Sequence, residues 1–258
     1  MLLYITNLKV TYRSASGGRR EAVAGVSLSL REGEILSLVG GSGSGKSTLG
    51  FSIARLTDFL PCSAQGSILL KERNVLEMTA REIQNLRRHE VAYVFQEPGS
   101  ALNPVLTVGE QVKESAGGGA RAGEALEDVG FRDPDRILRA YPHELSGGMK
   151  QRAVIAMALA KDPALLVADE PTTALDSASQ KEILKLLGAL RSRRLGVLFI
   201  THDLNVACAL SDRILVMQSG RIVDEIKDPR RPAPSHPYTR KLLNCAMAGR
   251  NPKAFFEV

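Results

Sequence analysis

The chain has 258 residues, of which 44% are hydrophobic and 24% charged, so it has enough apolar material to bury the core of one large domain. Its three cysteines show neither a CxxC nor a Cys/His ligand spacing, which argues against a zinc site, an iron–sulfur cluster or a secreted disulfide framework. The net charge of +6 is compatible with a nucleic acid, a membrane surface or a nucleotide as partner, but aromatic residues make up only 5% of the chain, so we expect no nucleic-acid partner.

The first forty residues predict short strands. Three apolar or alternating runs, Leu3–Tyr12, Val26–Leu30 and Ile35–Val39, are separated by turn-forming residues. A glycine-rich run at 40–45 follows the third of them, and Lys46–Leu56 then has helical character. The glycines therefore lie at a strand-to-helix junction, which is the context that a phosphate-binding loop requires.

The rest of the chain predicts a helical lobe and a buried sheet. Strand signals vanish over Thr107–Arg139, a helix is predicted over Gly147–Lys161, and the apolar run Ala164–Ala168 is typical of a strand that is buried on both faces. The elements predicted after this run are a helix over Ser177–Arg191 with a core-facing stripe, strands at Gly196–Thr201 and Arg213–Gln218, a hairpin return at Arg221–Ile226, an extended linker at Asp228–Pro237 and a helix over Pro237–Ala246.

The glycine-rich run has the spacing of a P-loop, G-x4-G-K-S. Glycines let successive N–H groups turn toward a phosphate, and we expect Lys46 to bridge the β- and γ-phosphates and Ser47 to bind Mg²⁺. A glycine-rich turn that arises by chance is the alternative, which the strand–loop–helix context disfavours. The residues expected to bind the nucleotide here are Gly40, Gly41, Ser42, Gly43, Ser44, Gly45, Lys46, Ser47 and Thr48.

A second candidate anion site, Leu145–Gly148, lies ahead of the buried run. Ser146 and the two glycines begin a predicted helix whose exposed N–H groups can hold a γ-phosphate, and Gln151 continues that helix. A plain helix N-cap is the alternative. Because a P-loop alone also occurs in kinases, GTPases and motors, this second motif is what narrows the class of protein.

With both motifs present, the sequence resembles the ABC ATPase family over nearly the whole chain. The resemblance implies an α/β fold: a P-loop NTPase (RecA-like) parallel-sheet core with an N-terminal antiparallel β subdomain and an inserted α-helical subdomain. We expect one domain over 1–258, with the ATP-binding core at 1–95 and 160–226, the helical subdomain at 96–159, and a C-terminal linker and helix at 227–258. In this family the signature of one subunit closes over the ATP of its partner, which implies a head-to-tail dimer.

Further motifs of the family follow in order. Leu165–Glu170 is similar to Walker B, which implies that Asp169 binds Mg²⁺ and that Glu170 is the general base for the attacking water. A helix N-cap is the alternative for this acidic pair. Gln96 is similar to the Q-loop glutamine, which contacts Mg²⁺ and water and moves with the helical subdomain.

The resemblance also assigns roles to three further residues, at the dimer interface, at the γ-phosphate and at the adenine ring. Asp176, in Ala174–Asp176, resembles the D-loop residue that organises the interface, and His202 resembles the switch histidine that contacts the γ-phosphate. Tyr12 corresponds to the adenine-stacking aromatic, although it can equally be an ordinary strand residue. The residues expected to act in catalysis are Lys46, Gln96, Glu170 and His202. The signature residues expected to bind nucleotide are Ser146, Gly147, Gly148 and Gln151.

Three parts of the chain are similar to the peptide/nickel importer branch: Phe95–Pro98 together with Ala101–Pro104 and Thr107–Glu110, then Tyr141–Glu144, and finally His236–Arg240. Gly41 departs from that branch, which usually has an acidic residue there, and Ser115–Glu124 is shorter and richer in glycine than expected. The chain also stops before the cysteine-bearing extension of many oligopeptide-importer ATPases, which leans toward the nickel or metallophore members.

The sequence therefore predicts an ATP-hydrolysing subunit, with ATP and Mg²⁺, that energises import of peptides or nickel chelates. Its expected partners are two permease subunits, a second ATPase subunit and, indirectly, an extracytoplasmic binding protein. The apolar runs are shorter than the ~20 residues of a membrane-spanning helix and the start lacks a signal peptide, so we expect a peripheral location on the cytoplasmic face of the membrane. The alternatives are a soluble ABC ATPase that acts on DNA, ribosomes or a metabolic complex, and a P-loop kinase or GTPase.

Overall fold

The computed structural model describes residues 1–13, 17–118, 122–173 and 175–247, and within them ten strands form two sheets. The smaller sheet is antiparallel in the order β2-β1-β4-β5, and its strands are β1 (Leu3–Arg13), β2 (Arg19–Leu30), β4 (Cys62–Leu70) and β5 (Arg73–Asn74). The larger sheet has the order β10-β9-β3-β8-β7-β6 and is parallel apart from the antiparallel edge strand β10. Its strands are β3 (Ile35–Val39), β6 (Val91–Val94), β7 (Leu165–Asp169), β8 (Gly196–Thr201), β9 (Arg213–Gln218) and β10 (Arg221–Ile226).

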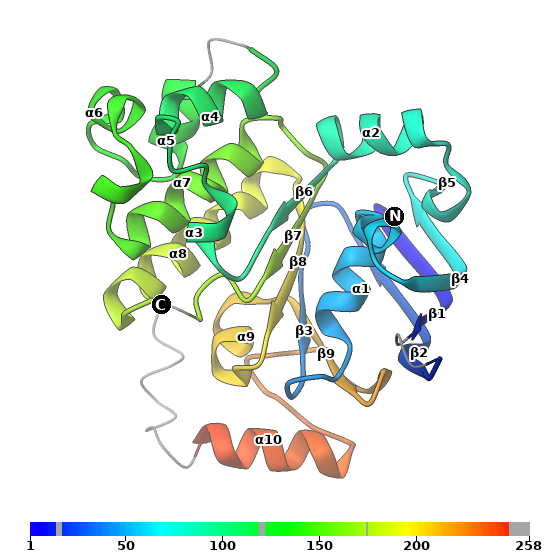
Figure 1. Cartoon of the computed structure of the whole chain (residues 1–258). Coiled ribbons are helices and arrows are strands. Elements are labelled where there is room, and N and C mark those ends of the chain that lie inside the picture. Colours follow the sequence, from blue (N-terminus) through cyan, green and yellow to red (C-terminus); the bar gives the residue numbers. More distant parts are fainter. Residues whose placement is uncertain (14–16, 119–121, 174, 248–258) are drawn as a thin grey trace.

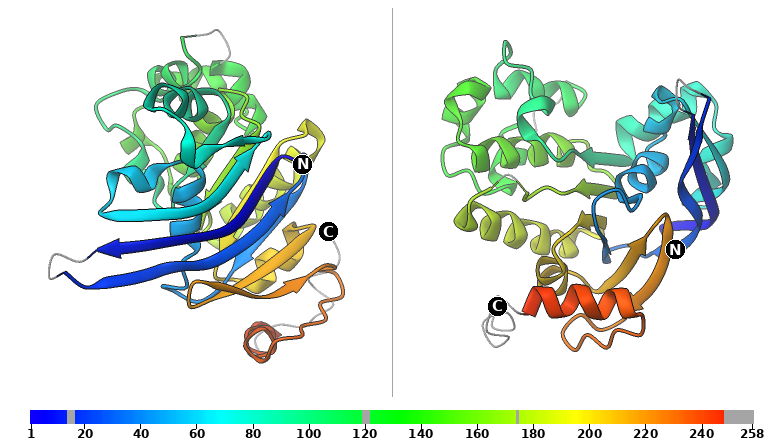
Figure 2. Two further views of the ribbon diagram at one scale, coloured as in Figure 1. Left: turned by 90° about the vertical axis from the view of Figure 1, so that its right-hand side faces the viewer. Right: turned by 60° about the horizontal axis from the view of Figure 1, so that its bottom comes forward.

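The helices divide into those beside the smaller sheet and those on the other side of the larger sheet (Figure 1), and the turned views in Figure 2 show the same separation. The α-helices are α1 (Lys46–Ile53), α2 (Ala80–His89), α3 (Pro98–Ala101), α4 (Val108–Ser115), α5 (Ala122–Asp128), α6 (Pro134–Arg139), α7 (Gly147–Leu159), α8 (Ser177–Ala189), α9 (Leu204–Leu210) and α10 (Pro237–Met247). Short 3-10 segments lie at η1 (Leu56–Phe59), η2 (Val75–Glu77), η3 (Pro142–Glu144) and η4 (Leu190–Arg193).

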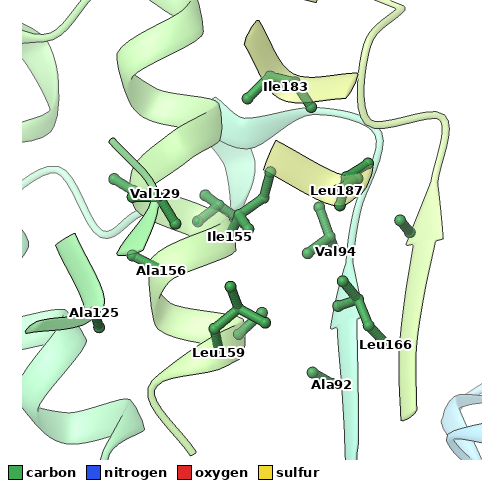
Figure 3. Packing of buried hydrophobic residues seen from close by; sticks show 14 of the residues in the cluster. Ala92, Val94, Ala125, Val129, Ile155, Ala156, Leu159, Leu166, Ile183 and Leu187 are labelled. Atoms are coloured by element: carbon green, nitrogen blue, oxygen red, sulfur yellow. The ribbon is translucent and has the colours of Figure 1, made fainter. Parts of the chain in front are cut away.

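The apolar strand β7 is buried on both faces, as its unbroken hydrophobic run predicted. On one face, Leu166 belongs to a cluster with Ile155 and Leu159 of α7 (Figure 3). On the other face, Leu165 and Val167 belong to a second cluster between the two sheets. Because side chains of β7 pack into clusters on both faces of the sheet, the strand is held in place, and with it the acidic residues at its carboxyl end.

The helix after the glycine-rich loop is shorter than predicted, because α1 ends at Ile53 instead of Leu56. Arg87 of α2 accounts for this end: its Nε donates to the carbonyl of Ala54 at 2.8 Å, so that helix-end carbonyl finds its donor in a side chain. Lys161, two residues beyond α7, in turn donates from Nζ to the carbonyl of Arg87 at 2.8 Å. The far ends of α1 and α7 are thus both tied to α2.

From residue 107 onward the predicted strands and the helices of α7, α8 and α10 agree with the structure to within two residues. The elements that sequence periodicity did not predict are β4, β5, α2, β6, α3 and α9. The interval 96–159 does hold α3 to α7, while its exact bounds as a subdomain stay a prediction. None of the helices in the described part of the chain has the length and apolar character that crossing a bilayer would demand.

Candidate active site

The loop between β3 and α1 has a shape that only glycine allows at two positions. A Cβ on Gly45, whose φ is 104°, would lie 2.1 Å from the carbonyl oxygen of Ala22. A Cβ on Gly40 would lie 2.2 Å from the carbonyl oxygen of Met217. Strands β2 and β9 therefore press directly on the loop backbone, and the two glycines predicted from spacing are the ones that permit this approach.

Lys46 begins α1 and folds back over this loop. Its Nζ donates to the carbonyl oxygens of Gly40 at 2.8 Å and Gly41 at 3.0 Å. Burial lowers the pKa of Lys46, and the neighbouring carboxylates of Glu170 and Asp169 oppose that shift. The ammonium is therefore held in a preformed position beside the N-terminus of α1, where an anion is favoured.

Asp169 ends β7 and is almost fully buried. Its Oδ2 accepts a hydrogen bond of 2.8 Å from the hydroxyl of Tyr93, whereas its Oδ1 has no hydrogen-bond partner among the described residues. Burial raises the pKa of Asp169, and the hydroxyls of Tyr93 and Ser47 oppose the shift. An unpartnered carboxylate oxygen beside a serine hydroxyl is a donor set that suits Mg²⁺, which prefers oxygen ligands.

Glu170 follows Asp169 and gathers three side chains around one oxygen atom. Its Oε2 accepts from the Thr173 hydroxyl at 2.8 Å, lies 3.1 Å from Nδ1 of His202, and lies 3.4 Å from Nε2 of Gln96. The N-cap alternative for the acidic pair is wrong, because the next helix, α8, is capped by Asp176. The structure thus brings together three of the predicted catalytic side chains from three separate segments.

The glycine-rich loop, Lys46 and the side chains gathered around Glu170 open on one cavity of about 890 Å³. The lining residues are Tyr12, Arg20, Ala22, Gly41, Ser42, Gly43, Ser44, Gly45, Lys46, Ser47, Thr48, Gln96, Glu170, Thr173 and His202. Tyr12 lines this cavity, where its hydroxyl lies 3.3 Å from the hydroxyl of Thr48, and its adenine-stacking role stays a prediction.

The residues of the second motif do not line this cavity. Ser146 caps α7 and accepts from the N–H of Met149 at 3.3 Å, so its N-cap interpretation is confirmed, while its role with phosphate stays a prediction. Ser146 and Gly147 are exposed, and Gly148 is buried against Ser179 of α8. Gln151 is fully buried, and neither atom of its amide has a partner within the described residues.

Asp176 is also outside the cavity. Its Oδ1 accepts from the N–H groups of Ala178 and Ser179 at 3.0 Å each, and these bonds lower its pKa. It caps α8 just beside the start of α7, so it lies next to the second motif. Ala174, the first residue of the predicted D-loop, lies outside the described residues.

Sequence reasoning missed several residues that the structure brings to this region. Tyr93 and Thr173 hold the two carboxylates, and Arg20 lies beside the loop. Tyr238 of α10 accepts a hydrogen bond from the N–H of Gly41. The only signal for Tyr238 was its place in the segment His236–Arg240, which local patterns identified as a linker and helix start.

A scan against family models matches residues 23–173 to the model described as ABC transporter. The chain belongs to this family. Over 95% of its length it is 43% identical to a probable peptide ABC transporter ATP-binding protein of Sinorhizobium fredii, 76% of which is covered. It is 42% identical to the oligopeptide transport ATP-binding protein OppD of Bacillus subtilis, with 94% of this chain and 71% of that protein covered.

Solved ABC structures agree with this assignment. A dimeric ATP-binding cassette bound to ADP and Pi superposes with a TM-score of 0.76 at 31% identity, covering 87% of this chain and 97% of that one. CbiO1 from Clostridium perfringens, part of a CbiONQ transporter complex, gives 0.76 at 27% identity, covering 98% and 97%. The predicted fold class and the predicted ABC-type ATPase are confirmed, and the kinase or GTPase alternative is excluded.

Proposed function

We propose that this ABC ATPase binds ATP with Mg²⁺ and uses its hydrolysis to drive the import of peptides. The observation that carries the proposal is the convergence of Glu170, His202 and Gln96 on the cavity that also holds the P-loop. The relatives described above are named as peptide or oligopeptide transport proteins, which supports peptides as cargo and gives no support to nickel chelates.

Lys46 and the loop N–H groups bind the phosphates. The carbonyls of Gly40 and Gly41 hold the ammonium and leave its remaining N–H for phosphate oxygens, so charge already positioned in a buried site is used without reorganising solvent. Ser47, Asp169 and Gln96 would hold Mg²⁺, Asp169 through water. When bound, the metal offsets negative charge on the β- and γ-phosphate oxygens.

Glu170 is the general base. Its Oε2 already accepts from three donors, and this fixes the carboxylate in the wall of the cavity, where it can reach a water that attacks the γ-phosphate. His202 is exposed and bonded to the same oxygen, so it turns from Glu170 to the γ-phosphate when nucleotide enters. Gln96, which precedes α3, links this change to the helical region.

The cavity is completed by a second ATPase subunit. Ser146 and Gly147 are exposed at the start of α7 and do not line the cavity of their own chain, which supports a role over the nucleotide of a partner. The partner is a second copy or a paralogue in head-to-tail contact. Two permease subunits and an extracytoplasmic binding protein complete the transporter, and this chain sits on the cytoplasmic face of the membrane.

The variant Glu170→Gln tests the assignment of the base. It should bind ATP, accumulate as a closed dimer on size-exclusion chromatography, and lose nearly all turnover, because an amide cannot accept the proton. Glu32→Gln is the matched control and should hydrolyse ATP normally, because Glu32 lies in an exposed turn ahead of β3, whereas the phosphate loop follows β3. Normal turnover in Glu170→Gln would show that another group is the base.

The transport assignment is tested in proteoliposomes. ATPase activity should rise when peptide-loaded binding protein is added to the complex of this chain with its permeases. ATPase activity that changes neither with the permeases nor with the loaded binding protein, together with salt-sensitive binding to DNA or ribosomes, would favour the soluble ABC ATPase instead.

A further inference from the structure

A contact between α10 and the phosphate loop is the basis of a further inference. The N–H of Gly41 donates a hydrogen bond of 2.9 Å to the hydroxyl of Tyr238, in the first turn of α10 and 197 residues away in sequence. Both groups are partly buried. The main-chain segment that carries this N–H is the same one that holds the ammonium of Lys46.

The two bonds act on opposite sides of one peptide unit. The N–H of Gly41 and the carbonyl of Gly40 belong to the same planar group, and in a trans peptide they point in opposite directions. Tyr238 binds the N–H, and Nζ of Lys46 binds the carbonyl at 2.8 Å. A rotation of this peptide plane would break both bonds, so the hydroxyl of Tyr238 fixes the carbonyl to which Lys46 is anchored.

Tyr238 is itself held firmly. Asp224 of β10 accepts from the hydroxyl of Ser235 at 2.6 Å and from the N–H of His236 at 2.9 Å, just before α10 begins. Burial alone would raise the pKa of Asp224, but these hydrogen bonds outweigh it and hold the pKa at about 2. Helix α10 packs on an apolar cluster formed by β3, α9, β9 and β10, and its residues in this contact are Tyr238, Leu242, Leu243 and Ala246. Figure 1 shows α10 lying below the edge of the sheet where the loop turns.

Gly41 leaves room for the hydroxyl. A Cβ built at this position would lie 3.2 Å from Oη of Tyr238, which is tighter than an ordinary van der Waals contact. Any larger side chain would therefore press on the hydroxyl and weaken the bond. The absence of a side chain at Gly41 and the presence of Tyr238 are complementary.

We propose that Tyr238 is a positioning residue for the phosphate loop, which sets the affinity for the nucleotide through the peptide between Gly40 and Gly41. The inference rests on the proposed binding of ATP by this loop. Tyr238 touches no reacting atom; it acts by keeping the loop in the shape from which Lys46 reaches the phosphates.

The test is Tyr238→Phe in the full chain, with the dissociation constant for Mg-ADP measured by calorimetry. Loss of one neutral hydrogen bond should weaken binding about three- to tenfold, and the KM for ATP should rise while kcat changes little. Tyr4→Phe, on an exposed position of β1, is the matched control and should bind like the wild type. Thermal unfolding of each variant separates lost affinity from lost stability.

A second variant tests whether Tyr238 acts through its contact with Gly41. Gly41→Ala should weaken binding in the wild-type background, but it should add little to Tyr238→Phe, because the displaced hydroxyl is already absent. Additive effects, or unchanged affinity in Tyr238→Phe, would overturn the inference while the ATP site stands. If the wild type binds no nucleotide and Lys46→Ala makes no difference, it is the proposed function that fails.

Discussion

Tyr93→Phe removes a single hydroxyl beside the Walker B carboxylate and keeps the aromatic ring. The hydroxyl of Tyr93 donates to Oδ2 of Asp169 at 2.8 Å, and Asp169 is only 5% exposed. A hydrogen bond to a charged group contributes about 1.5–3 kcal/mol, and its loss leaves a buried carboxylate with less compensation. The pKa of Asp169, which burial already raises, should rise further. The ring contact of Tyr93 with Phe95, at 4.7 Å between centroids, is retained.

Two measurements follow from this loss. At about 2–4 °C per kcal/mol for a chain of this size, the melting temperature should fall by roughly 3–12 °C. The Mg²⁺ concentration that half-saturates ATP hydrolysis should rise about tenfold or more, because the group that orients a metal ligand is gone, and kcat should recover at saturating Mg²⁺. Tyr4→Phe is again the control. If neither the melting temperature nor the Mg²⁺ requirement changes, Tyr93 does not hold the carboxylate and the argument is refuted.

Further predictions concern the second motif, the C-terminal anchor and the phosphate loop. Gly148→Ala puts a Cβ 2.6 Å from Oγ of Ser179, so it should lower the free energy of unfolding in urea by about 1–3 kcal/mol. Gly147→Ala is the control, because the nearest neighbour of its Cβ would be at 3.9 Å. Equal losses of stability in the two variants would contradict the packing argument. Because the pKa of Asp224 is lowered to about 2, its stabilisation is present above the unfolded pKa near 3.9 and is lost as pH falls toward 2. The melting-temperature gap between the wild type and Asp224→Asn should therefore shrink below about pH 4; a gap that widens there would reverse the sign. Lys46→Ala should weaken nucleotide binding itself in calorimetry, and unchanged affinity would remove Lys46 from the site.

The phosphate loop could be predicted from sequence because its requirement is local. Gly40 and Gly45 are needed where neighbouring strands approach the backbone within a distance that excludes a Cβ, and such positions leave a fixed glycine spacing. The strand β7 could also be predicted, since burial on both faces leaves an unbroken apolar run. In both cases the structural constraint acts on residues that are close together in the sequence, so a local pattern reveals it.

Other elements leave a weaker trace. Helix α2 is mostly polar and buries only Ile83 and Leu86, so its pattern is too sparse to stand out. The strand β4 alternates in burial, but only Ile68 and Leu70 are fully buried and its first half consists of small and polar residues, so its apolar signal is weak. Tyr93 and Tyr238 act through contacts with residues 76 and 197 positions away, which no local pattern encodes. Their roles become visible only once the chain is folded.

The tie at Arg87 and Lys161 has a mechanical consequence. It lies at the far ends of α1 and α7, the two helices that begin at the phosphate loop and at Ser146. Helix α7 has 13 residues and so forms an arm of about 20 Å between this tie and Ser146. A tilt of about 10° around the tie displaces the Ser146 end by roughly 3–4 Å on an arm of that length. In the proposed head-to-tail dimer, such a tilt would bring Ser146 toward the nucleotide of the partner while the end of α7 near the tie, and with it α1 and the phosphate loop, moved little.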